Sequence, residues 1–153
     1  MIDVYYKVKA FAEIGVKVHL HCFQYGRPQA KELERLCASV HYYPRRTGKH
    51  LLLNSLPYVV VTRRSDALTS RLLKDDHPIL FEGLHSCYSL GDPRFHGRKR
   101  LVRAHNVEHD YYTALAKAEG NAFRRTYFLN EARKLLRFEP VLNGKFLRVN
   151  LSR

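Results

Sequence analysis

Cysteine is scarce in this 153-residue chain, and it does not occur in closely spaced pairs. Cys22, Cys37 and Cys87 form an odd number with no C-x-x-C motif, so we expect reduced thiols in a cytoplasmic protein. No apolar run approaches the roughly 18 residues that a membrane-spanning helix needs. The N-terminus lacks the basic and then apolar pattern of a signal peptide, and no internal repeat or low-complexity linker occurs.

Acidic residues are also few. Lys and Arg number 27 against 14 Asp and Glu, which leaves a net charge of +13. Such an excess favours polyanionic partners: nucleic acid, an anionic membrane surface or phosphorylated ligands. The plain alternative is a set of solvated basic faces, and no zinc-finger, homeodomain or RNA-recognition signature accompanies the charge. The basic residues cluster at positions 45–46, 63–64, 98–100 and 124–125.

Hydrophobic residues make up 45% of the chain and charged residues 27%, as in an ordinary soluble domain. Helical and strand patterns alternate along it. Val4, Val8, Phe11 and Ala12 have helical spacing and Gly15 follows as a stop. The patterns predict helices over residues 4–12, 30–36, 57–74, 108–118 and 122–138, and strands over 16–22, 39–43, 78–82 and 100–104. Strands separated by helices imply a single α/β domain with a Rossmann-like parallel sheet and flanking helices.

Ligands of such sheets bind beyond the carboxyl ends of the strands. Two segments occupy that place, residues 82–86 after one predicted strand and residues 105–109 after the next. Sequential βα units often lie side by side, so we expect the two loops to converge on one crevice and to bring His85 near His105.

The second loop spells H-x-x-E-H, from His105 to His109, which is the inverted zinc-protease signature. A zinc site would need both histidines inside one helix, four residues apart. Here His105 directly follows a predicted strand, and Asn106 is suited to cap the next helix. We therefore expect no metal, and a zinc hydrolase is the weaker alternative. Its third ligand would be a downstream carboxylate, of which the chain offers Glu119, Glu131 and Glu139.

Several segments together resemble a known family. They are PILFEGLHSCY (78–88), LVRAHNVEHDYY (101–112) and EARKLLRFE (131–139), with EIGVKVHLHCFQYGR (13–27) and VHYYPRRTG (40–48) in the same pattern. In order and spacing they are similar to the N-terminal half of GT-B glycosyltransferases, closest to bacterial enzymes of glycosyltransferase family 4. The resemblance covers roughly residues 4–142.

The resemblance implies an acceptor-binding domain, here in part and over residues 1–142, that faces a second, donor-binding domain. It also implies retaining, metal-independent transfer of a hexose from a nucleotide-sugar co-substrate to a saccharide or lipid-linked acceptor, with no further cofactor. His105 matches the histidine that lies beside the transferred sugar and stabilises charge there. The residues matching the acceptor side of the cleft are His85, Glu82, Arg103, Asn106, Glu108 and His109. Each has a structural alternative: Asn106 as a cap, Glu108 as a first-turn acid, and Arg103 as an ion-pair partner.

The match departs from the family at both ends. The family's first strand has no counterpart before the first predicted helix, residues 143–153 read as a tail outside the family, and the donor domain is absent. We therefore expect a glycosyltransferase fragment that is inactive alone, marginally stable and prone to aggregate. The basic surface would suit the cytoplasmic face of an anionic membrane. A basic nucleic-acid-binding or other anion-binding α/β domain is the alternative function, although we expect no nucleic acid.

Overall fold

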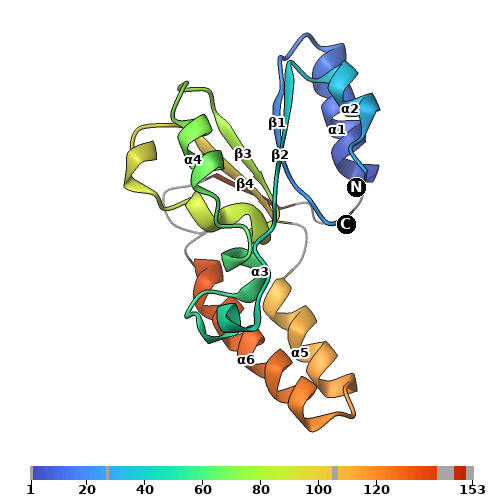
Figure 1. Cartoon of the computed structure of the whole chain (residues 1–153), viewed down its shortest axis with the longest axis vertical. Helices are drawn as coiled ribbons and strands as arrows, with labels where there is room; N and C mark the ends of the chain where they lie inside the picture. The colour runs from blue at the N-terminus through green and yellow to red at the C-terminus, as the bar shows by residue number, and fades with distance from the viewer. Residues whose placement is uncertain (1, 27, 105–106, 141–146, 151–153) are drawn as a thin grey trace. The chain divides into compact units, whose positions relative to one another are not determined.

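The structure is a computed structural model that describes residues 2–26, 28–104, 107–140 and 147–150. The chain divides into two compact units, residues 1–45 and 46–153, each of which has its own parallel strands. The predicted α/β class with parallel pairing is confirmed, whereas the single domain over residues 1–142 stays a prediction. Figure 1 labels the helices and strands.

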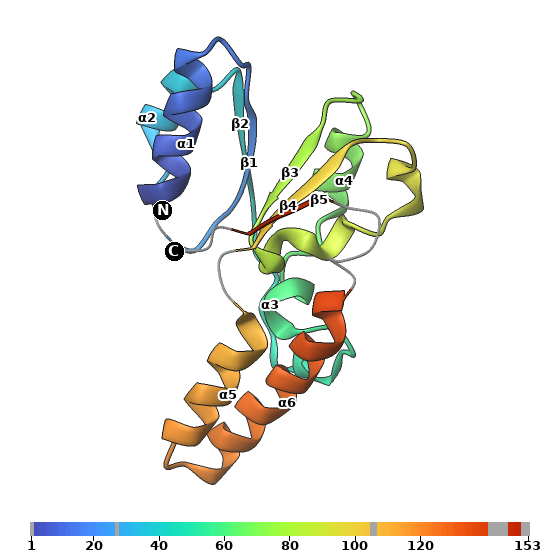
Figure 2. The ribbon, with the colours of Figure 1, turned by 180° about the vertical axis from the view of Figure 1, so that it is seen from behind.

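The first unit contains the helices α1 (Ile2–Glu13) and α2 (Lys31–Leu36) and the strands β1 (His19–Phe23) and β2 (Ser39–Tyr43). α1 ends as predicted, because Gly15 has a φ of +78° and Val16 donates its N–H to the carbonyl of Phe11 over 2.9 Å. The two strands pair in parallel, with His21 opposite His41. Both helices lie on one side of this pair (Figures 1 and 2).

The second unit contains three parallel strands in the order β3 (Ile79–Glu82), β4 (Arg100–Ala104) and β5 (Leu147–Asn150). Its helices are α3 (Tyr58–Val61), α4 (Asp66–Leu72), α5 (Glu108–Ala118) and α6 (Ala122–Phe138), and its short 3₁₀ helices are η1 (Lys49–Leu53), η2 (Leu84–Ser89) and η3 (Pro93–Phe95). Its core is a cluster of buried residues from the strands, η2, η3, α3, α4 and α6: Val60, Leu72, Ile79, Phe81, Leu84, Cys87, Leu90, Phe95, Val102 and Leu135.

The single helix predicted over residues 57–74 is wrong, because two helices form there. The carbonyl of Thr62 accepts the backbone N–H of Arg46 over 2.9 Å, instead of an N–H from the next turn of a continuous helix. Ser65 then adopts an extended conformation and caps α4, accepting the N–H of Leu68 on its side-chain oxygen over 3.2 Å. Helical periodicity could not predict this break, because the competing hydrogen-bond donor, Arg46, lies 16 residues upstream.

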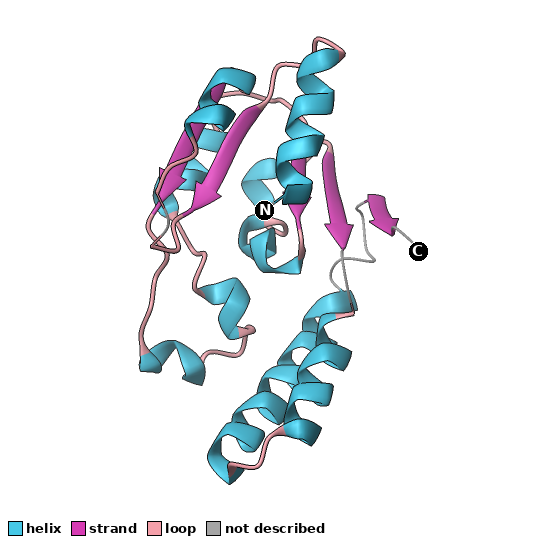
Figure 3. Ribbon diagram, turned by 90° about the vertical axis from the view of Figure 1, so that its right-hand side faces the viewer, coloured by secondary structure: helices cyan, strands magenta, loops and turns pink. Residues whose placement is uncertain are grey.

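β5 lies inside the segment that the sequence predicted to be a tail. It pairs in parallel with β4, with Leu101 opposite Leu147 and Arg103 opposite Val149. Apolar residues at positions 147, 149 and 151 alternate with polar ones at 148 and 150, which is a strand pattern that could have revealed it. In the sequence, α5 and α6 lie between β4 and β5. The two helices pack antiparallel as a helical hairpin (Figure 3).

Candidate functional site

The carboxyl ends of β3 and β4 lie at one edge of the sheet, as predicted, since the strands are parallel neighbours. Glu82 and Arg103 are register partners there, and Arg103 Nη1 donates to Glu82 Oε2 over 3.2 Å. Both side chains are largely buried, and they lie on the face opposite the core-facing Phe81 and Val102. This geometry matches the ion-pair alternative for Arg103 and leaves the pair at the edge where a ligand would bind.

His85 lies directly after this edge, over Gly83. Gly83 has a φ of +79°, and a Cβ built on it would come within 2.6 Å of Cε1 of the His85 ring. The carbonyl of Gly83 accepts both the backbone N–H of Ser86, over 3.0 Å, and the Ser86 hydroxyl, over 2.8 Å. The positive φ thus favours glycine at position 83, and the missing Cβ leaves the space that the imidazole of His85 occupies.

His109 lies in the first turn of α5 with both ring nitrogens near carboxylates. Its Nδ1 lies 2.7 Å from Glu139 Oε2, and its Nε2 lies 3.4 Å from Asp110 Oδ1. The backbone N–H of His109 also donates to Glu139 Oε1, over 3.2 Å. Glu139 therefore joins the end of α6 to the start of α5. This contact supports a structural role for His109, and sugar binding by His109 stays a prediction.

The loop between β4 and α5 contains His105 and Asn106, which lie outside the described residues. α5 begins at Glu108, as predicted, and its N-cap position is occupied by Val107, which makes no side-chain cap. Of the two histidines of H-x-x-E-H, only His109 lies in the described part of α5, so the expected absence of a zinc site stays a prediction. Within the described ranges no group of three or more His, Cys, Asp or Glu side chains could hold a metal ion.

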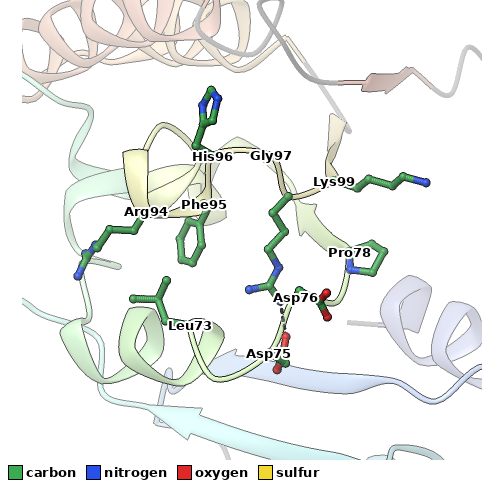
Figure 4. Close-up of a pocket in the computed structure, with 10 residues that line it drawn as sticks. Leu73, Asp75, Asp76, Pro78, Arg94, Phe95, His96, Gly97 and Lys99 are labelled. Carbon is green, nitrogen blue, oxygen red and sulfur yellow. Dashed lines mark hydrogen bonds and ion pairs between the residues drawn. The ribbon is translucent and has the colours of Figure 1, made fainter.

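Two hollows of the second unit lie away from the predicted site residues. The first, about 550 Å³, lies at the amino ends of β3 and β4, and the second, about 350 Å³, lies between η2, η3 and α4. Figure 4 shows that the side chains of Arg94, His96 and Lys99 around the first hollow point in different directions. Because these side chains do not converge, we assign no ligand site to this hollow.

Two of the predicted basic clusters are partly used inside the fold. Arg98 donates from Nε to the carbonyl of His77 over 2.5 Å, from Nη1 to the carbonyl of Leu72, and from Nη2 to Asp75 over 2.5 Å. Arg63 is buried, and burial lowers the pKa of its guanidinium to about 10. The sequence clusters suggested that these residues belong to solvated basic faces, but Arg63 and Arg98 are used inside the fold instead.

All three cysteines are free thiols, as expected. Burial is the largest cause that raises the pKa of each, and it raises the pKa of Cys87 to about 12. None of the three therefore has the thiolate character of a reactive cysteine.

Fold and edge geometry define an α/β protein whose polar residues gather at the carboxyl edge of a parallel sheet. An uncharacterized 44.6 kDa protein in the cps region of Klebsiella pneumoniae is 31% identical over 103 residues. That similarity covers 65% of this chain, and the chain spans about a quarter (26%) of the length of that relative. No protein-family model matches the chain, and no solved structure matches it. No helix in the described part of the chain is both long and apolar enough to cross a membrane.

Proposed function

We propose that the carboxyl edge of β3 and β4 is the acceptor side of a glycosyl-transfer site of the kind found in GT-B enzymes of glycosyltransferase family 4. The observation that carries the proposal is the Glu82–Arg103 pair at the strand edge, followed at once in the chain by Gly83 and by His85, whose ring lies over Gly83. Carboxylates, guanidinium groups and imidazoles provide the hydrogen-bonding groups that sugar hydroxyls need. The relative in a cps, or capsular polysaccharide, region supports a role in polysaccharide synthesis.

In this proposal each residue acts on the acceptor or on the transferred sugar. Glu82 accepts hydrogen bonds from sugar hydroxyls, and Arg103 orients that carboxylate by donating to its Oε2 atom. His85 contributes a further ring nitrogen from η2, and Glu108 lies at the start of α5. His105 would hydrogen-bond the transferred sugar and stabilise the charge that develops near its anomeric centre. The donor nucleotide-sugar would bind to a partner domain, and transfer needs no metal.

Saccharide binding by the chain itself tests this proposal. Hexose-containing oligosaccharides and UDP-hexoses would be titrated into ¹⁵N-labelled protein, and we expect amide shifts around residues 82–86 and 103–104 with oligosaccharides alone. Glu82→Gln should weaken that binding about tenfold, because it removes a charged acceptor. The control is Asp92→Asn, since Asp92 accepts from Arg94 over 2.7 Å in an ion pair away from the edge. Shifts caused by nucleotide alone, or equal effects of both variants, would contradict the assignment.

Nucleic-acid binding is a second candidate function, because the net charge of +13 favours polyanionic partners. A nucleic-acid protein should bind duplex DNA or single strands with a steep salt dependence and without any effect of sugars. Filter binding at several salt concentrations, with Glu82→Gln beside the unaltered chain, separates the two functions. We expect no specific nucleic-acid binding, and therefore no tight complex at physiological salt with either the unaltered chain or Glu82→Gln.

A further inference from the structure

One side of α6 exposes leucines and arginines together. Leu129 and Leu136 are 40% and 54% exposed, and they lie seven residues apart, so they share one side of the helix about 10 Å apart. Arg125 and Arg133 lie three or four residues from these leucines, Arg137 lies four residues beyond Arg133, and all three arginines are exposed. We call this side the outer face of α6; its residues are Arg125, Leu129, Arg133, Leu136 and Arg137.

The other side of α6 holds the helix in its unit. Glu131, Ala132 and Leu135 are buried there, and Leu135 belongs to the core cluster. The ring of Phe128 packs edge-on against that of Tyr112 in α5, with centroids 6.1 Å apart. The outer face is therefore not needed to pack α6 in its unit, and packing does not explain why leucines occupy it.

The charge of the outer face has one sign. α6 contains five basic residues and a single acidic one, Glu131, which is buried and paired with Lys134 over 2.8 Å. Among the described residues, no side-chain ion pair or hydrogen bond is found for Arg125, Arg133 or Arg137. This face thus presents three cations and two exposed leucines with no carboxylate between them, whereas Arg63 and Arg98 are used inside the fold.

We propose that the outer face of α6 docks on an anionic lipid bilayer. A helix of this kind lies in the plane of the membrane surface, with its apolar side chains among the acyl chains and its arginines at the lipid phosphates. A nucleic-acid backbone would attract the arginines but would leave both leucines in water. The inference goes beyond the proposed transfer chemistry and does not rest on it.

Vesicle co-sedimentation of the full chain tests the apolar half of the proposal. We expect binding to vesicles of phosphatidylglycerol and phosphatidylethanolamine, and none to phosphatidylcholine alone. Leu129→Ser with Leu136→Ser should weaken binding at least about fivefold, because both side chains enter the interface. Leu53→Ser is the matched control, since Leu53 is 90% exposed in η1 and lies outside the outer face. All positions are at the surface, and circular dichroism should show unchanged folding.

A charge-matched pair of triple variants tests the basic half. Glutamine in place of the three arginines of the outer face should weaken vesicle binding at least about tenfold and flatten its salt dependence. The control removes the same charge from exposed lysines elsewhere in the second unit, at Lys49, Lys99 and Lys117, and should retain most of the binding. Equal losses in both triples would overturn the proposal, because net charge alone would then explain binding.

Three further outcomes would also overturn it. The first is an unchanged affinity for vesicles when both leucines are replaced. The second is binding to duplex DNA or RNA, without vesicle binding, that depends on the arginines but not on the leucines. The third is self-association, measured by analytical ultracentrifugation without lipid, that the leucine variants abolish while vesicle binding is absent.

Discussion

Replacing Glu131 should strongly destabilise the second unit. Its carboxylate is 1% exposed. Oε2 accepts the backbone N–H of Tyr58 over 2.6 Å, and Oε1 accepts from Lys134 Nζ over 2.8 Å. The same ammonium also donates to the carbonyl of Leu52 over 2.8 Å. One buried carboxylate thus joins α6 to the start of α3 and, through Lys134, to η1.

Glu131→Ala would leave the N–H of Tyr58 and the ammonium of Lys134 without this acceptor. An orphaned backbone donor costs about 1–3 kcal/mol, and breaking a buried ion pair by removing one partner costs about 3–5 kcal/mol. Since one carboxylate supplies both contacts, the two costs overlap, and we expect a total loss of about 3–5 kcal/mol. Glu131→Gln keeps a neutral acceptor and should lose less, about 1–3 kcal/mol.

Urea unfolding of the full chain, followed by circular dichroism, measures these losses. Glu131→Leu combined with Lys134→Met removes both charges together, so this double variant should be more stable than Glu131→Ala. A loss below about 1 kcal/mol for Glu131→Ala would refute the reasoning, because such a value is typical of a solvent-exposed pair. A double variant that is as unstable as the sum of its two single variants would refute the pairing of the two charges.

Three other outcomes follow from the geometry. Gly83→Ala should lower the unfolding free energy by about 1–3 kcal/mol, since φ is +79° there; adding His85→Ala should recover only the steric part, and full recovery would exclude backbone strain. Glu139→Ala removes the two hydrogen bonds between His109 and Glu139, so amide exchange in the first turn of α5 should speed up while that in α4 does not. The Cys87 thiol should resist alkylation at pH 8 until urea unfolds the chain, because burial raises its pKa from 9.0 to about 12. Burial of the neutral thiol stabilises the folded chain fully below pH 9, and this contribution is lost as pH rises toward 12. The free energy of unfolding should therefore be smaller at pH 10.5 than at pH 8.

Local sequence patterns predicted the helices and strands best where a proline or a change of pattern marks their ends. β2, β4, α5 and α6 have the predicted bounds, because β-branched and aromatic runs or helical spacing stop at residues such as Pro44 and Pro140. The predicted strand over 16–22 is displaced, since β1 runs from His19 to Phe23. Residues 84–95, which form η2 and η3, have no regular period from which short 3₁₀ turns can be predicted.

Some features of the candidate site could also be predicted from local patterns, and others could not. Placing His85 beyond one strand and Glu108 at the start of the next helix required only the order of strands and helices, and both positions are confirmed. The partners of these segments could not be predicted. Glu139 lies 30 residues from His109 in sequence and meets it because α5 and α6 pack antiparallel.

By itself, the sequence determined the α/β class, the parallel pairing, the edge at which Glu82 and Arg103 meet, and an excess of positive charge. These properties depend on residue type and on short-range spacing, which every chain carries before it folds. Only the tertiary structure decided which basic residues are used internally, such as Arg98, and which remain on the outer face of α6. It also placed the carboxylate of Glu131 at the backbone N–H of Tyr58, where α3 begins. Burial and pairing depend on segments distant in sequence, and no local pattern records which segments come together.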